Sequence, residues 1–440
     1  MTPARGVYVL LTGLLAPFVL LREGWQSLRD GAGRGRVRQR LGYVERARAS
    51  GPLWVHAVSV GEVQAAAAFV RAVARRHPGL GLVVSTVTPT GAQRARALFG
   101  ETVQHCYLPY DLPGAMRRFL DRIAPRAVVV LETELWPTLY AELAQRRIPL
   151  VIGSARLTTR SVARYRRAGA LVRETLAVPA VIGTQTAEDA ARFRELGAPA
   201  ARVQVTGNLK FDLEIAMEQV AAGRALRAQI GTGRPVWIAG STHEGEETAA
   251  LAAHAAVRAR HPEALLVLVP RHPHRFEAVR ALLERRGVPH VRRSTGALPG
   301  PGHAVLLVDT VGELQTLYAS ADVAFVGGSL VPIGGHSLLE PAVLGLPVLS
   351  GPHTENGREI ATLLAQCGAL EIVDGAEALE RAVLARFDAP EAARAAGERG
   401  RRAVEANRGA VGRLVELVEP RLVSPAGARP AASSASSGSR

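Results

Sequence analysis

The sequence contains very little cysteine and few aromatic residues. Its two cysteines, Cys106 and Cys367, lie far apart and form no CxxC motif or Cys/His cluster. This arrangement argues against a disulfide framework and a structural zinc site, and the composition fits a reducing compartment. Aromatic residues make up 5% of the chain, and no pattern typical of a nucleic-acid-binding module is present. These two absences argue against nucleic acid as a partner.

Familiar nucleotide and metal signatures are also missing. Neither GxxxxGK[ST] nor GxGxxG occurs, which argues against a P-loop NTPase and a simple dehydrogenase. The segment that starts at His243 is no HExxH zinc helix, because Glu247 stands where the second histidine would be. His272 and His274 have no third ligand at usable spacing. We therefore expect neither a bound metal ion nor a cofactor.

Negative charge is scarce, and nearly all the positive charge is arginine. The net charge is +15, and of the 54 Lys and Arg residues only Lys210 is lysine. A positive balance favours anionic partners such as phospholipid head groups or phosphorylated substrates. A general drift of the composition toward arginine explains much of the surface charge equally well.

The N-terminus carries an uncharged apolar segment, Val7–Leu21. It is shorter than the roughly 20 residues of a spanning helix, and Pro17 interrupts it. No small-residue cleavage site follows, as a secretory signal would require. Eight arginines against three acids between Arg22 and Arg48 form a positive flank, which keeps that side in the cytoplasm. We predict an uncleaved membrane anchor in residues 1–25, spanning or only dipping into the bilayer; a buried first helix is the alternative.

The rest of the chain alternates apolar β-rich runs with helical patterns rich in Ala, Leu and Arg. This rhythm is typical of parallel α/β sheets. The length of 440 residues predicts two domains. We expect Rossmann-like domains at 26–215 and 216–423, a ligand site in the cleft between them, and a disordered tail at 424–440. Strands are predicted at 53–57, 81–85, 127–131, 150–152, 180–182, 235–239, 264–269, 304–308, 323–326, 347–349 and 370–373. Helices are predicted between them, for example at 63–76, 115–123, 187–196, 244–260, 275–286, 313–320 and 358–366.

Acidic residues follow two predicted strands of the first half, where functional residues of such sheets gather. Glu62 comes after the first strand, at a tight turn that Gly61 permits. An acid at a helix start can also simply complement the helix dipole. Glu132 and Glu134 leave the apolar strand 127–131 and flank a threonine beside a tryptophan. Two carboxylates in such a place are typical of a polar site.

Lys210 is the most suggestive single residue, because a chain that uses arginine almost everywhere uses lysine once. The lysine ammonium is a compact charge on a flexible stem, whereas arginine is a planar fork, so some sites cannot exchange them. A site beside a departing phosphate is one of these. Chance is the alternative, and we favour a functional role.

Three polar segments of the second half follow predicted strands, and the second and third of them suit phosphate. Ser241–Glu247 follows a predicted strand and is rich in hydroxyl and acidic groups. Pro270–Arg275 gathers arginines and histidines on a loop stiffened by proline. The glycine-rich segment Gly327–Glu340 follows strand 323–326 and enters a short helix, whose first backbone amides would hold phosphate. Glu340, in that helix, could bind ribose hydroxyls.

Taken together and in order, these segments resemble a known family. From about Trp54 to Ile372, the chain is similar to the Kdo transferases, bacterial enzymes that add the acidic sugar Kdo to lipid A. The strings that carry the resemblance are HAVSVGE, TPTG, YLPYDLP, ETELWP, ARL, GNLKFD, STHEGEE, PRHPHRF, VDTVGEL, FVGGSL and GGHSLLEP.

The resemblance implies a GT-B glycosyltransferase that is inverting and metal-independent. CMP-Kdo would be the donor, and a lipid A precursor (lipid IVA) the acceptor, at the cytoplasmic face of the inner membrane in lipopolysaccharide core biosynthesis. Glu62 matches the general base of the family, and Glu132 and Lys210 match its transition-state-stabilising positions. The CMP-binding positions match Pro270, Arg271, Val311, Gly312, Glu313, Ser337, Leu338, Leu339 and Glu340.

The chain departs from the family pattern in two places. It reads GGHSLLE where members often read GGHNPLE, so Ser337 and Leu338 replace an amide and a proline. Ser154 stands in place of the asparagine of NARL. Both changes keep a small or hydrogen-bonding residue at the polar position, so we expect activity to survive. The alternatives are a transferase for another lipid, a nucleotide-sugar epimerase, and a membrane-bound nucleotide-sugar sensor without turnover. The sequence leaves open the oligomeric state and the number of Kdo residues transferred.

Overall fold

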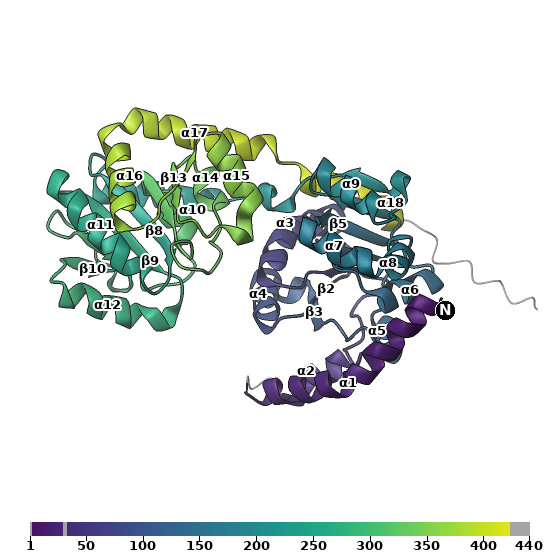
Figure 1. Ribbon diagram of the computed structural model, residues 1–440. Coiled ribbons are helices and arrows are strands. Elements are labelled where there is room, and N and C mark those ends of the chain that lie inside the picture. The colour runs from purple at the N-terminus through teal and green to yellow at the C-terminus, as the bar shows by residue number, and fades with distance from the viewer. Residues whose placement is uncertain (1, 30–32, 423–440) are drawn as a thin grey trace, which may run out of the picture. The chain divides into compact units, whose positions relative to one another are not determined.

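The computed structural model describes residues 2–29 and 33–422 and divides them into two compact units (Figure 1). The first unit contains the residues up to Asp212 and the described residues from Arg408 onward, and the second is Leu213–Asn407. The predicted second domain, 216–423, is therefore too long at its C-terminal end, because the last helix returns to the first unit. The predicted disordered tail, 424–440, lies outside the described residues.

The first unit is built on a parallel seven-stranded sheet in the order β3-β2-β1-β4-β5-β6-β7. Its strands are β1 (Leu53–His56), β2 (Leu82–Thr86), β3 (Gln104–Tyr107), β4 (Ala127–Leu131), β5 (Leu150–Ala155), β6 (Val181–Thr184) and β7 (Val203–Val205). The helices that follow β1 to β6 are α3 (Val60–Arg76), α4 (Pro89–Phe99), α5 (Pro113–Ile123), α6 (Pro137–Gln145), α7 (Thr159–Arg167), α8 (Gly169–Leu176) and α9 (Ala187–Glu195).

The central strands of this sheet are buried on both faces, which is why they read as continuous apolar runs. Alternate residues serve opposite cores: Trp54 packs with Phe119 on one side, and Val55 with Phe69 on the other. The second of these cores also contains Leu414, Val415 and Val418 of α18 (Ala410–Leu422). Burial of these side chains against the first sheet is the physical reason why α18 belongs to the first unit.

The second unit repeats the design with the sheet order β10-β11-β9-β8-β12-β13-β14. Its strands are β8 (Val236–Thr242), β9 (Leu265–Pro270), β10 (His290–Arg292), β11 (Val305–Leu307), β12 (Val323–Val326), β13 (Val348–Ser350) and β14 (Leu370–Ile372). Its helices are α10 (Met217–Ile230), α11 (Glu246–Arg260), α12 (Phe276–Arg285), α13 (Leu314–Tyr318), α14 (Leu339–Val343), α15 (Arg358–Gln366), α16 (Ala376–Asp388) and α17 (Pro390–Ala406).

Each sheet has a point at which the strand order reverses. In the first sheet this switch point lies between β1 and β4, and in the second between β8 and β12. Two helices that leave neighbouring strands toward opposite faces open a crevice at the strands' carboxyl ends, and ligands of such sheets bind there. The topology therefore places a candidate site at the carboxyl ends of the central strands in each sheet.

The N-terminal helix α1 (Pro3–Arg29) lies on the first unit together with α2 (Gly33–Arg40) (Figure 1). The Tyr8 hydroxyl donates to buried Asp111 at 2.9 Å, Arg5 pairs with Glu174, and Glu23 pairs with Arg36. By length and composition the helix could cross a membrane. None of its apolar window is buried, so the alternative of a buried first helix is wrong. Apart from Val19, the exposed large apolar side chains of the helix form one stripe: Val7, Leu10, Leu11, Leu14, Leu15, Phe18, Leu21 and Trp25.

Candidate active site

The predicted catalytic residues of the first half come together at the switch point of the first sheet. Glu62 lies in the first turn of α3, directly after β1, and Glu132 directly follows β4. Lys210 lies in the short helix η3 (Leu209–Asp212), which packs against α3. The Lys210 Nζ donates to Glu132 Oε1 at 3.0 Å, and both side chains are about three-quarters covered. Residues from three distant parts of the sequence thus form one polar cluster.

Glu62 is held by the start of its own helix. Its Oε2 accepts from the Val58 backbone N–H at 2.8 Å, and its Oε1 accepts from the Ser59 hydroxyl at 3.0 Å. Ser59 is the N-cap of α3, so the two residues form a variant of the capping box. Each carboxylate oxygen has two lone pairs, so each can accept a further hydrogen bond. Glu62 can therefore cap the helix and also act as a catalytic base, since the cap fixes the direction of its carboxylate.

The carboxylates of this cluster influence one another. Burial raises the pKa of Glu62, and the nearby charge of Glu132 adds to the rise. Burial also raises the pKa of Glu134 to about 7, with further contributions from Glu62 and Glu132. Groups with a raised pKa in a crevice are candidates for proton transfer near neutral pH. Glu134, which the sequence analysis noted without a catalytic role, belongs to the cluster electrostatically.

The backbone beneath the cluster is strained at two positions. Glu132 has φ 55° and Ser154, in β5, has φ 52°, although neither is glycine. A residue held in this left-handed region costs about 1–3 kcal/mol, and such strain persists where the surroundings fix it. The Ser154 hydroxyl oxygen accepts from the Leu209 N–H at 3.3 Å and from Gln185 Nε2 at 3.2 Å. Ser154, one of the two departures from the family pattern, therefore holds the turn that carries Lys210.

The turn that carries Lys210 is also held by α18. The Asp212 carboxylate accepts from the Gly409 N–H at 2.6 Å, and Arg413 donates to the Thr206 carbonyl at 2.8 Å. Asn208 Oδ1 accepts from the Lys210 N–H at 3.0 Å. The C-terminal helix thus helps to position Lys210. The sequence analysis missed this contact because it assigned all residues from 216 to 423 to the second domain.

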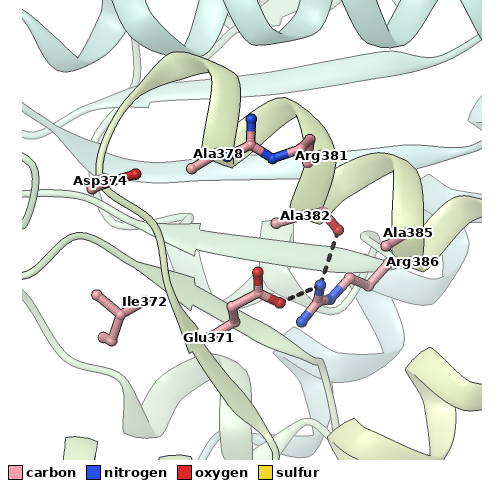
Figure 2. A pocket seen from close by; sticks show the side chains of 8 residues that line it. All are labelled: Glu371, Ile372, Asp374, Ala378, Arg381, Ala382, Ala385 and Arg386. Atoms are coloured by element: carbon pink, nitrogen blue, oxygen red, sulfur yellow. Dashed lines mark hydrogen bonds and ion pairs between the residues drawn. The ribbon is translucent and has the colours of Figure 1, made fainter.

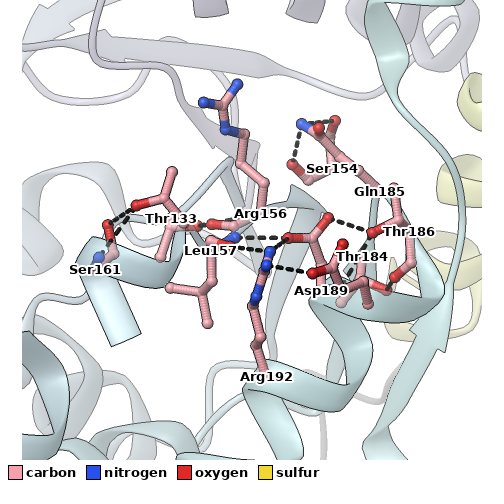
Figure 3. Close-up of polar contacts among 12 residues, drawn as sticks. Thr133, Ser154, Arg156, Leu157, Ser161, Thr184, Gln185, Thr186, Asp189 and Arg192 are labelled. Carbon is pink, nitrogen blue, oxygen red and sulfur yellow. Dashed lines mark hydrogen bonds and ion pairs between the residues drawn. The ribbon is translucent and has the colours of Figure 1, made fainter. Parts of the chain in front are cut away.

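Arg156 lies beside this cluster, directly after β5 (Figure 3). Its N–H donates to Thr133 Oγ1 at 3.2 Å, and its carbonyl accepts from the same hydroxyl. The next residue, Leu157, is held by Asp189 at 2.8 Å and Arg192 at 2.7 Å. Among the described residues, the Arg156 guanidinium forms no hydrogen bond or ion pair, and Figure 3 shows it extending away from this network. The backbone is fixed, and the cation is left available to an anion.

The second unit places only part of the predicted CMP-binding set at its surface. Arg271 is exposed after β9, which ends at buried Pro270, and Val311 is 76% exposed beside Gly312. Glu313 accepts from Arg293 at 2.8 Å and from the Thr310 hydroxyl at 3.1 Å.

Farther along, Ser337 is exposed, whereas Leu338 and Leu339 are each only 3% exposed. The side chains of both leucines pack inside the unit, so only their backbone could reach a ligand. Glu340 accepts from Gln315 Nε2 at 3.2 Å.

The first part of the glycine-rich segment, which precedes the predicted phosphate site at the helix start, is bound by an acidic side chain of the same unit. The fully buried carboxylate of Glu246 accepts from the N–H groups of Gly328 at 2.7 Å and of Ser329 and Leu330 at 2.9 Å. These three amides are therefore not free for phosphate. Any phosphate contact must come from the later part of the segment, around Ser337 and the start of α14. Sequence reasoning missed Glu246 because its partners lie more than 80 residues away.

A surface pocket of about 590 Å³ lies elsewhere, beside β14 and α16 (Figure 2). Glu371 and Arg386, which line it, form an ion pair, and Arg386 also donates to the Ala382 carbonyl at 3.1 Å. β14 is the edge strand of the second sheet, away from the switch point between β8 and β12. The pocket contains none of the predicted site residues. Within the described residues, no group of three His, Cys, Asp or Glu side chains is placed to hold a metal ion.

Two α/β units, each built on a parallel sheet with polar residues at its switch point, define the class. This class is the GT-B fold, which enzymes of nucleotide sugars use. Comparison with solved structures agrees. The UDP-GlcNAc 2-epimerase from Neisseria meningitidis, solved with UDP-GlcNAc, superposes with a TM-score of 0.53 over 84% of this chain and 99% of its own. At 14% sequence identity, this likeness shows the fold alone.

Sequence comparison identifies the family within that class. The family model of 3-deoxy-D-manno-octulosonic-acid (Kdo) transferase matches residues 35–213. The Kdo transferase of Haemophilus influenzae is 41% identical over 421 residues, covering 95% of this chain and 99% of the relative. That of Bordetella pertussis is 39% identical over 430 residues, covering 94% and 99%. The chain belongs to the Kdo transferase family, and the predicted class of enzyme, a glycosyltransferase, is confirmed.

Proposed function

We propose that this enzyme moves Kdo from CMP-Kdo to a lipid A precursor, lipid IVA, with inversion at the anomeric carbon. The observation that carries the proposal is the cluster of Glu62, Glu132, Glu134 and Lys210 at the switch point of the first sheet. A capped, partly buried carboxylate beside a second carboxylate and an ammonium ion is suited to proton removal next to a developing charge.

Glu62 acts as the general base. The acceptor hydroxyl attacks the anomeric carbon of Kdo, and the Glu62 carboxylate takes its proton as the new bond forms. The cap formed by Val58 and Ser59 aims the carboxylate, and burial makes it a stronger base than an exposed glutamate. A positioned base of this kind contributes roughly 10²- to 10⁴-fold in rate.

Glu132 and Lys210 act as an electrostatic pair. Sugar transfer passes through a transition state with positive charge on the ring, which a carboxylate such as Glu132 stabilises. Lys210 holds that carboxylate at 3.0 Å and brings a positive charge toward the acidic sugar and its departing phosphate. Arg156, whose backbone is fixed by Thr133, offers a second cation at the carboxyl ends of the same strands. It is available to acidic groups of the substrates.

The second unit binds the donor nucleotide. In this proposal, Arg271 and the Ser337 hydroxyl, which are both exposed, contact phosphate, and Glu340 contacts ribose. The buried side chains of Leu338 and Leu339 restrict their part to backbone contacts. The predicted cleft between the two domains stays a prediction.

We place the enzyme at the cytoplasmic face of the inner membrane, with α1 lying in the interface and not spanning the bilayer. Ion pairs and hydrogen bonds at Arg5, Tyr8 and Glu23 tie the helix along the first unit over most of its length. Its opposite side is a continuous apolar stripe. A helix with one tethered polar face and one apolar face is suited to lie in a membrane surface.

The direct test is mass spectrometry of lipid IVA after incubation with CMP-Kdo and the full-length chain in detergent. A mass gain of one or more Kdo units that requires both substrates is the expected result, and it also counts the sugars added. If the acceptor mass stays unchanged while the donor is consumed or isomerised, the transfer proposal is wrong. A donor that binds without being consumed would indicate a sensor.

A further inference from the structure

Four side chains that can carry positive charge gather at the switch point of the second sheet. They are His243 after β8, Arg271 and His272 after β9, and His336 after β12. The Nε2 atoms of His243 and His336 are 2.8 Å apart, and the two rings are nearly parallel, at 9°. The ring of His272 meets that of His243 edge-on, with 5.3 Å between their centroids. We call His243 and His336 the histidine pair.

The backbone around the histidine pair is fixed by buried groups. Glu246 accepts from the His243 N–H at 2.9 Å while it binds the loop after β12. Gly328 has φ 69°, and a Cβ at this position would lie 2.9 Å from His336 Cδ2. Asn356 donates to the Gly335 carbonyl at 3.2 Å, directly before His336. The pair is therefore built into the fold, and glycine at 328 makes room for it.

The charges around the histidine pair repel one another. The pKa of His336 is lowered to about 4, chiefly by burial and in addition by the positive charges of Arg271, His243 and His272. The pKa of His243 is lowered by burial and by Arg271 and Arg275, and raised only by Glu246.

The acidic groups nearby are already engaged. Glu246 accepts from four backbone N–H groups, and Glu244 and Glu247 pair with Arg275 at 3.2 Å. An anion placed among Arg271 and the histidines would supply the missing negative charge.

We propose that the histidine pair, together with Arg271, binds the phosphate of the donor nucleotide and takes up a proton from solvent as the nucleotide binds. The identity of the donor rests on the function proposed above; the roles of His243 and His336 are additional to it. In the neutral pair one Nε2 donates and the other accepts, so the 2.8 Å contact persists when a proton is added at Nδ1 of the donating ring. His336 directly precedes Ser337, and the Arg271 N–H donates to Thr242, next to His243. The pair thus connects two segments assigned to the nucleotide.

The proton would also assist transfer. The phosphate of a nucleotide sugar is a diester with one negative charge, and it gains a second charge when CMP departs. A protonated histidine pair stabilises the departing dianion more than the bound donor, which is the condition for faster chemistry.

The test measures binding of CMP and of cytidine to the full-length chain by calorimetry at pH 7.5, in buffers of different ionisation enthalpy. The wild-type chain should prefer CMP to cytidine and take up a fraction of a proton with CMP only. The double variant H243Q/H336Q should bind CMP about tenfold more weakly, the effect of a lost hydrogen bond to a charged group, and take up no proton. His290→Gln, on edge strand β10, is the control and should behave as wild type.

A second measurement needs no variant: the affinity of the wild-type chain for CMP should fall between pH 6.5 and 8.5, and that for cytidine should stay constant. The inference is overturned if the double variant keeps the CMP preference and the proton uptake, or if wild-type affinity is independent of pH; the proposed donor would then still stand. If the wild-type chain binds no CMP at all, both the inference and the proposed donor are wrong.

Discussion

At the scale of single residues, the candidate site could be read from the sequence where chemistry and position coincide. Glu62 and Glu132 follow strands, and Lys210 is the single lysine. The structure brings the three together, with Lys210 and Glu132 in contact at 3.0 Å. The residues that hold them could not be foreseen. Ser154 holds Leu209, 55 residues away, and Glu246 holds Gly328, 82 residues away, and no local pattern encodes such contacts.

Lys210→Ala should slow transfer far more than it weakens folding. The variant loses the ammonium beside Glu132, and the loss of one such group costs about 10²- to 10³-fold in rate. A partly exposed ion pair contributes only about 1 kcal/mol or less to stability. Steady-state kinetics and chemical denaturation measure the two effects.

Two further variants control the Lys210 experiment. Lys210→Arg keeps the charge but should remain slow, because the planar fork cannot take the place of the compact ammonium. Arg146→Ala removes a surface ion pair of the same unit, formed with Asp121 at 2.7 Å, and should leave the rate unchanged. A rate for Lys210→Ala equal to that of Arg146→Ala would contradict the role given to the lysine.

Glu134 should make stability depend on pH. Its pKa is raised to about 7 in the folded chain, whereas an unfolded glutamate titrates near 4.5. The folded state therefore binds this proton more tightly. Its contribution is fully present below about pH 4.5 and is lost as the pH rises through 7. Between these values, wild type should lose about 1–3 kcal/mol of unfolding free energy relative to Glu134→Gln. Parallel pH profiles in denaturation experiments would refute this.

At the scale of elements, the apolar strands of both sheets were predicted to within a few residues because buried parallel strands read as continuous apolar runs. The strands that were missed, β3, β7 and β10, are short and carry polar residues, for example Gln104 and His105 in β3. Their pairing comes from the neighbouring strands and not from their own pattern. The assignment of α18 failed for a related reason, because a helix pattern does not tell which sheet the helix covers.

The docking of α18 can be tested by cavity formation. Leu414 is fully buried, and a Cβ added at Gly153 of β5 would lie 2.7 Å from its Cδ2. Leu414→Ala should lower the unfolding free energy of the chain by about 2–5 kcal/mol. Glu416→Ala, exposed on the same helix, should change it by about 0.5 kcal/mol or less. Denaturation curves that coincide for the two variants would show that α18 is not packed there.

At the scale of the whole molecule, the two-sheet fold is the one that the apolar pattern predicted. The family acts on anionic substrates, as the positive net charge suggested. The sequence left open whether the N-terminal segment spans the bilayer or dips into it. The contacts of Tyr8 and Glu23 with the first unit support the proposal that the helix lies on the membrane surface. This detail depends on tertiary partners, so hydropathy alone cannot give it.

The double variant L14E/F18E tests whether the apolar stripe of α1 binds the membrane. Both side chains are exposed in the apolar stripe, at 64% and 71%. Removing them should weaken binding to vesicles that contain anionic lipid by about tenfold or more, since each contributes about 1.5–3 kcal/mol when buried. Val205→Glu, at an exposed apolar position on β7 of the same unit, should bind like wild type. Equal vesicle binding by both variants would exclude the stripe as the docking face.

The central claim is that Glu62 removes the proton of the acceptor hydroxyl. The most direct measurement is the transfer rate of Glu62→Gln, determined together with its affinity for CMP. Glutamine can keep the helix cap but cannot take a proton, so the variant should fold and bind CMP as wild type does. Its rate should fall by about 10²- to 10⁴-fold. Transfer at the wild-type rate by this variant would contradict the account.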